Sequence, residues 1–212
     1  MKNISTNIIS KTEKWNCMTH AAGILFGIVF IPKMLFDAFK FCDYDQFLNI
    51  VSYSIFFFCT FLFSTIYHWL PCSQMKECFR KLDQACIHFL IAATYLPLIS
   101  KYMNIGEGLL LLTLVCIFVP VGIVLIWQYK SKYSSAMVAV YALQGLMYLF
   151  FFNSFFENMP LYVMQMILVG SIFIVVGIFF FRQQKWKYNH AIWHLFVLCG
   201  NILFFFAIEE SL

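Results

Sequence analysis

The sequence predicts an all-α integral membrane protein that folds as a bundle of seven transmembrane helices. Of its 212 residues, 62% are hydrophobic and only 11% are charged, whereas about a quarter of a typical soluble domain is charged. The mean hydropathy is +0.81. A soluble fold of this size leaves roughly 30% of its unfolded surface exposed and cannot hide so much apolar surface. This composition argues against a soluble enzyme, a disordered chain and a nucleic-acid-binding protein.

Seven apolar runs of membrane-spanning length support this fold class. Helices of about 21 residues would use roughly 147 positions, so the connections must be short and leave no room for a soluble domain. We therefore expect an N-terminal tail at 1–16, a transmembrane domain at 17–208 and a C-terminal tail at 209–212. The seven runs cover residues 17–39, 46–70, 82–99, 107–128, 134–152, 161–181 and 190–208.

The runs differ in how clearly they resemble membrane spans. The first contains Pro32, Lys33 and Asp37 near its far end, and the second is rich in phenylalanine. The third follows a polar and basic segment, the fourth is the most uniformly apolar, and the fifth is the least hydrophobic. The sixth and seventh are separated by a short basic connection. All have about the 17 to 25 residues that a helix needs to cross a bilayer.

The basic residues predict the orientation of the bundle, because cytoplasmic connections of membrane proteins carry an excess of Lys and Arg. With a cytoplasmic N-terminus, eleven of the fourteen Lys and Arg residues lie on the cytoplasmic side. Only Lys33, Lys40 and Lys101 then lie on the other side. We therefore expect the N-terminus inside, the C-terminus outside, and a multi-pass protein of the plasma membrane.

The cysteines do not indicate a disulfide framework or a thiolate metal site. There are eight cysteines, and none of them form a Cys-x-x-Cys pair. Several fall inside apolar runs, where cysteine behaves as a small hydrophobic residue. Any metal site is therefore expected to use other side chains.

Histidines near the ends of the apolar runs predict such a site, because ionisable side chains within membrane spans are costly and usually functional. His190 and His194 are four residues apart, so on a helix both imidazoles project from one face, about 6 Å apart along the axis. His68 lies near the cytoplasmic end of the second run, at the depth where the seventh begins. Three protein ligands with an open fourth position are typical of catalytic zinc. We predict that His68, His190 and His194 bind Zn²⁺.

Two more polar residues are expected beside this metal. Ser64 lies one turn before His68 on the same helix face, and Asp83 lies in the first turn of the third run. A carboxylate at this place can accept a hydrogen bond from a metal-bound water or from an imidazole. Each pattern also has a simpler explanation: paired histidines are common in helices, serine often bonds to its own helix, and aspartate often caps a helix.

The other two histidines are assigned differently. His88 is five residues after Asp83 and points to another face of the third helix, so we expect a packed histidine that hydrogen-bonds between helices. His20 lies on the cytoplasmic part of the first run. It fits two roles about equally well, one orienting a metal ligand and the other making a polar contact between helices.

These motifs together resemble the bacterial hemolysin III family, whose relatives are the progestin and adipoQ receptors and, more distantly, the alkaline ceramidases. The resemblance covers nearly the whole chain, and its combination of motifs is more specific than any single one. The matching stretches are Glu13-x2-Asn16-x2-Thr19-His20-x2-Gly23, Ser64-x3-His68, Phe79-Arg80-Lys81-Leu82-Asp83, and His190-Ala191-Ile192-Trp193-His194.

The resemblance implies a seven-helix bundle with a cytoplasmic N-terminus and a zinc ion held by the three matching histidines. It also implies that the aspartate and serine matching Asp83 and Ser64 lie near the metal. One departure is visible, because bacterial members commonly have a histidine after the aspartate and this chain has Gln84. The receptor-type relatives lack that histidine as well, so the predicted metal site is unaffected.

Three functions are consistent with these observations. The first is a zinc-dependent hydrolase of a membrane lipid, such as a ceramide-like amide, in which Asp83 accepts a proton and Ser64 stabilises the oxyanion. The second is a pore-forming haemolysin or a receptor, as the family names suggest, although the ionisable residues gather at the cytoplasmic third rather than along a channel. The third is a membrane protein with a purely structural zinc. A membrane lipid is the expected partner and no nucleic acid is expected.

Overall fold

The computed structural model describes residues 9–128 and 135–212 and confirms an all-α membrane protein. Within this part of the chain, seven helical segments are long and apolar enough to cross a membrane. Some positions used in the sequence analysis lie outside the described residues. They are Lys2, Lys130 and Lys132, which enter the charge count, and the first position of the run at 134–152. The long helices are α1 (Lys11–Phe41), α2 (Tyr44–Trp69), α3 (Gln74–Tyr102), α4 (Ile105–Gln128), α7 (Leu161–Arg182) and α8 (Asn189–Glu209).

The helices begin earlier than the apolar runs because their first turns are polar and capped. The side chains of Ser10, Asp43 and Ser73 accept hydrogen bonds from the backbone N–H groups three residues later, at the starts of α1, α2 and α3. Such caps satisfy N–H groups that have no partner within the helix. As a result, α1 begins within the expected N-terminal tail and α3 begins eight positions before the expected third run.

The early start of α3 corrects the expected place of Asp83. Because α3 begins at Gln74, Asp83 lies in the third turn of the helix and not in the first. The cap of α3 is Ser73. An aspartate this far inside a helix is no cap, so the simplest alternative explanation for this residue is removed.

The fifth span is a broken helix. It consists of α5 (Ser135–Gly145), a 3₁₀ segment η1 (Met147–Phe151) and the short α6 (Phe152–Phe156). Tyr95 of α3 bridges the break: its hydroxyl donates to the Gly145 carbonyl (2.8 Å) and accepts from the Tyr148 N–H (3.2 Å). Backbone groups freed inside a membrane need such partners. The sequence did not predict this interruption.

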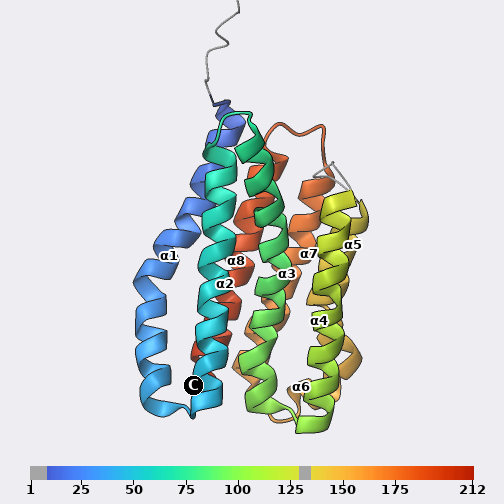
Figure 1. The fold of residues 1–212 in the computed structure, drawn as a ribbon. Coiled ribbons are helices and arrows are strands. Elements are labelled where there is room, and N and C mark those ends of the chain that lie inside the picture. The colour runs from blue at the N-terminus through green and yellow to red at the C-terminus, as the bar shows by residue number, and fades with distance from the viewer. Residues whose placement is uncertain (1–8, 129–134) are drawn as a thin grey trace, which may run out of the picture.

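The helices pack side by side along one axis, with the start of α1 and the C-terminus at opposite ends (Figure 1). Helix α8 lies within the bundle and contacts α1, α3 and α7. Glycines bring α7 and α8 close together, because a Cβ atom on Gly170 would lie 3.2 Å from the carbonyl oxygen of Gly200. Small residues at such crossings are typical of membrane helices. The first two turns of α8 contact α2 through His190 and α1 through His194.

Candidate metal centre

Three histidines from two distant parts of the chain meet at one end of the bundle. His68 comes from the last turns of α2, and His190 and His194 come from the first two turns of α8. One ring nitrogen from each lies within 4.8 Å of the others, and the Nε2 atoms of His68 and His190 are 3.3 Å apart. His68 and His194 are almost completely buried. The structure thus brings together the three residues predicted to bind zinc.

Helix α1 supplies hydrogen-bond partners behind two of these rings. The Nδ1 atom of His68 contacts the carboxylate of Glu13, and Asn16 lies 3.5 Å away. The Nδ1 atom of His194 lies 3.2 Å from the carbonyl oxygen of Asn16 and 3.2 Å from the Thr19 hydroxyl. Glu13, Asn16 and Thr19 are spaced by three residues, so they follow one face of α1. This face contacts the histidines of α2 and α8.

These contacts determine which nitrogen can bind a metal. A carboxylate and a carbonyl oxygen only accept hydrogen bonds, so Nδ1 of His68 and of His194 carries the proton. The Nε2 atoms then hold lone pairs, and such lone pairs repel one another unless a cation or a proton lies between them. A metal-ligating histidine usually donates its other N–H in this way. The donor set therefore fits a zinc ion bound by imidazole nitrogens.

Ser64 lies one turn from His68, and its surroundings are unusual for a serine inside a membrane helix. Ser54, Thr60 and Thr65 of α2 donate to the carbonyl four residues earlier in their own helix. The Ser64 hydroxyl is buried and has no hydrogen-bond partner among the described residues. The expected bond back to its own helix is therefore not made, and the hydroxyl remains available at the cavity wall.

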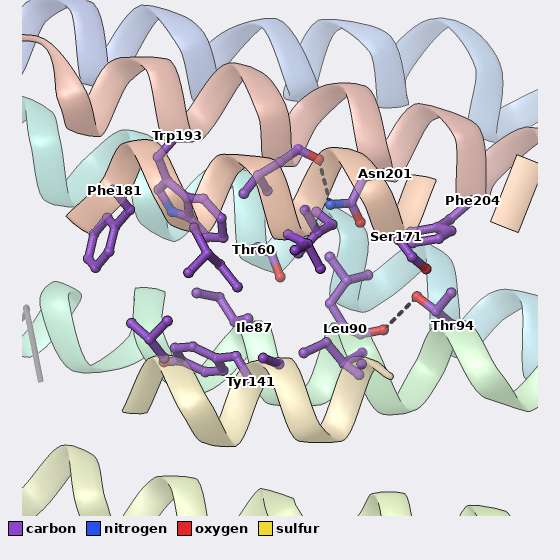
Figure 2. A pocket seen from close by; sticks show the side chains of 18 of the residues that line it. Thr60, Ile87, Leu90, Thr94, Tyr141, Ser171, Phe181, Trp193, Asn201 and Phe204 are labelled. Carbon is purple, nitrogen blue, oxygen red and sulfur yellow. Dashed lines mark hydrogen bonds between the residues drawn. The ribbon is translucent and has the colours of Figure 1, made fainter. Parts of the chain in front are cut away.

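Asp83 lies on the wall of the same cavity. The cavity runs from the histidines into the bundle between α3, α5, α7 and α8, and about 180 Å³ of it is available to the centre of a water molecule. Asp83, Ser64, His190 and His194 all line it, and most of its other lining residues are aliphatic or aromatic. Figure 2 shows this wall from Phe181 and Trp193 at one end to Asn201 and Phe204 at the other.

The remaining histidines occupy different environments. His88 is fully buried, away from the other histidines, and its Nδ1 lies 2.6 Å from the amide oxygen of Gln144 in α5. This agrees with the predicted bond between helices. His20 is buried with its ring centroid 3.9 Å from that of His194, and neither of its nitrogens has a hydrogen-bond partner among the described residues. It therefore lines the metal centre without making the alternative polar contact between helices.

The motif on α1 was not assigned a role beyond the resemblance. The three-residue spacing of Glu13, Asn16 and Thr19 is a signal from which one polar face on the first helix could have been predicted. The spacing could not predict which helices this face contacts, because α8 follows α1 by about 150 positions in the sequence. Gln84, the departure from the bacterial pattern, accepts a hydrogen bond of 2.6 Å from Arg80.

The fold and the site define a seven-helix membrane protein with a buried histidine cluster at one end. Residues 9–205 match the family described as Haemolysin-III related, and the chain belongs to that family. It is 29% identical over 198 residues to Hemolysin-3 of Bacillus cereus, covering 93% of this chain and 90% of that protein. It is 28% identical over 201 residues to the Hemolysin-3 homolog of Bacillus subtilis (strain 168), covering 93% of each.

A mammalian protein is also similar over most of its length. The human monocyte to macrophage differentiation factor is 26% identical over 209 residues, covering 93% of this chain and 83% of that protein. No solved structure matches the chain. The family assignment therefore rests on the sequence match, and it agrees with the resemblance carried by the motifs.

Proposed function

We propose that this protein is a zinc-dependent hydrolase of the plasma membrane that cleaves a lipid amide of the ceramide type. The observation that carries the proposal is the histidine cluster, in which one ring nitrogen of each histidine lies within 4.8 Å of the others and two of the three histidines line a largely apolar cavity. The cavity wall accommodates an acyl chain, and the polar end accommodates the bond to be cleaved. His68, His190 and His194 would hold the ion, which when bound supplies an activated water and polarises a carbonyl.

The chain's own residues supply the proton transfer. The Asp83 carboxylate accepts a proton from the attacking water as the new carbon–oxygen bond forms. The Ser64 hydroxyl donates a hydrogen bond to the carbonyl oxygen as negative charge develops there. Asp83 then gives the proton to the leaving nitrogen as the carbon–nitrogen bond breaks. The products are a fatty acid and an amine, and both residues return to their starting states.

The test is metal analysis of purified protein followed by mass spectrometry of lipid products. We expect about one zinc per chain and release of fatty acid from a ceramide-like substrate by the unchanged protein. The His194→Ala variant should lose both. Turnover that persists after zinc has been removed and its absence verified would contradict a zinc-dependent hydrolase.

A second candidate comes from the names of the Bacillus relatives, which describe hemolysins. Under this alternative the protein would permeabilise membranes, and the zinc would be structural. Lysis of erythrocytes by the purified protein, equal in His194→Ala and unchanged protein after correction for folding, would favour the pore.

A further inference from the structure

Several polar side chains interrupt the apolar wall of the cavity, and the hydroxyls of Thr94, Tyr95 and Tyr148 among them donate to other groups of the protein. Asn201 of α8 and Ser171 of α7 both line the cavity, and both are more than nine-tenths buried. Polar residues inside membrane helices are costly and usually have a function. Figure 2 shows Asn201 and Ser171 near the end of the cavity opposite Phe181. The proposed chemistry at the histidines uses neither of them.

The two residues lie at the same depth. Gly170 and Gly200, the residues directly before them, are in close contact, since a Cβ atom on Gly200 would lie 3.0 Å from the Gly170 carbonyl oxygen. Asn201 follows His194 by seven residues, which places it on the same face of α8 and about 10 Å further along the axis. The pair therefore forms a second polar level at a fixed distance from the metal centre.

Each side chain has hydrogen-bonding capacity left over. The Asn201 amide nitrogen donates to the carbonyl of Val197 (2.8 Å), but its amide oxygen has no partner among the described residues. Ser171 accepts a hydrogen bond from the Tyr148 hydroxyl (3.0 Å), and no described residue accepts its own proton. The level thus offers one acceptor and one donor. A hydroxyl group, which both donates and accepts, matches this pair.

We propose that Asn201 and Ser171 form a subsite for a hydroxyl group in the middle of a long acyl chain. The inference rests on the proposed function in that the cavity takes a lipid chain with its carbonyl at the histidines. Carbon–carbon bonds of about 1.5 Å advance an extended chain by somewhat less per carbon. A separation of about 10 Å along the helix therefore places the hydroxyl roughly eight or nine carbons from the carbonyl.

The test is a binding measurement, which does not require turnover. Displacement of a fluorescent octadecanoate from purified protein is compared for octadecanoate, 10-hydroxyoctadecanoate and 2-hydroxyoctadecanoate. We expect the 10-hydroxy chain to bind about fivefold more tightly than the plain chain, the net effect of roughly one hydrogen bond. The 2-hydroxy chain should show no such gain, because its hydroxyl lies beside the histidines.

The variants identify the groups responsible. Asn201→Leu, which keeps a similar volume, should bind the plain chain as before and lose the preference, and Ser171→Ala should lose part of it. Ser54→Ala is the control, since it removes a buried hydroxyl of α2 that bonds to its own helix and does not line the cavity. Unfolding temperatures measured on each variant establish that binding is compared between folded proteins. If Asn201→Leu does not fold, Ser171→Ala is the variant that tests the subsite.

The outcomes separate this inference from the proposed hydrolase. Equal affinity for the three fatty acids, a preference that survives in Asn201→Leu, or failure of all three to bind would overturn the subsite. A preference for the 10-hydroxy chain in a protein that hydrolyses no lipid amide would support the subsite and contradict the hydrolase. Hydrolysis of a lipid amide without any preference for the 10-hydroxy chain would support the hydrolase and contradict the subsite.

Discussion

At the scale of single residues, the histidines differ in the hydrogen-bond partner of their Nδ1 atoms. His68 and His194 contact α1 through their Nδ1 atoms, which leaves the Nε2 atom of each ring available for a metal. His88 uses its Nδ1 for Gln144 of α5 and packs against Gly122 of α4, where a Cβ atom would lie 1.8 Å from its ring. The same type of side chain therefore forms the candidate metal centre in one place and joins helices in another.

Removing a histidine should separate these two roles. His68→Ala, His190→Ala and His194→Ala should each lower zinc affinity by at least tenfold, because two remaining ligands seldom hold zinc against competition. His88→Ala should keep the full metal content and lower the unfolding temperature instead, because it leaves a cavity and an unpaired amide. Metal content is measured by mass spectrometry on the purified proteins. Zinc loss from His88→Ala equal to that from His194→Ala would show that the third ligand is wrongly chosen.

Asp83 distinguishes a catalytic metal from a structural one. The Asp83→Asn change keeps the shape of the side chain but removes its ability to accept a proton. If Asp83 is the general base, hydrolysis should fall by about 10²–10⁴-fold while zinc content and unfolding temperature stay near those of the unchanged protein. All three are measured on one preparation. Retained zinc with undiminished hydrolysis would exclude Asp83 as the base.

At the scale of helices, α1 acts on the metal centre without contributing a ligand. Its polar face of Glu13, Asn16 and Thr19 contacts histidines of both α2 and α8. Hydrogen bonds of this kind orient the imidazole and raise its basicity. The first and last spans are thereby coupled through side chains and not only through packing.

Weakening this face should lower metal affinity while leaving the ligands in place. We expect Glu13→Gln and Thr19→Val each to reduce zinc affinity by about 10–100-fold, the usual effect of removing such a partner. Thr65→Val is the matched control, because Thr65 lies near His68 but bonds to its own helix. Affinity is measured by competition with a zinc chelator. An equal loss in Thr65→Val would mean that the effect reports general loosening of α2.

The break in the fifth span gives a second prediction at this scale. Tyr95→Phe removes the hydroxyl that serves Gly145 and Tyr148, and an unpaired buried group costs about 1–3 kcal/mol. The variant should unfold at a lower temperature with unchanged zinc content. Tyr44→Phe, which alters an exposed tyrosine, is the control. A Tyr95→Phe protein as stable as the control would show that the break needs no bridging hydroxyl.

At the scale of the whole molecule, the start of α1 and the C-terminus lie at opposite ends of the bundle of seven spans (Figure 1). The histidines of α2 and α8 share the end at which α1 begins. We expect that end to face the cytoplasm, because this orientation would put eleven of the fourteen Lys and Arg residues of the sequence on the cytoplasmic side. This is the positive-inside pattern.

A reporter joined to the C-terminus tests that orientation. Alkaline phosphatase, which is active only outside the cytoplasm, should be active in this fusion, and a fluorescent protein that matures only in the cytoplasm should be dark. The same two reporters joined after Gln128 serve as controls and should give the opposite pattern. A fluorescent C-terminal fusion would reverse the orientation and place the histidines at the outer face.

The sequence predicted the class of fold because seven apolar runs in so hydrophobic a chain can form few structures other than membrane-spanning helices. It predicted the convergence of His68 with His190 and His194 because antiparallel spans put those positions at one depth. It misplaced Asp83, since α3 is extended by a polar capped turn that hydropathy does not detect. It also missed the break after Gly145, because the hydroxyl that stabilises it belongs to another helix.

The shared place of the histidines on α2 and α8 has a consequence for how the protein is made. A ribosome releases the chain from its N-terminus, so α1 and α2 enter the membrane while α8 is still unmade. At that moment Glu13 and His68 are already in the chain, but the other two histidines are not. If the three histidines bind zinc as proposed, zinc uptake must follow insertion of the last span, and a cell starved of zinc should accumulate full-length inserted apoprotein instead of arrested fragments.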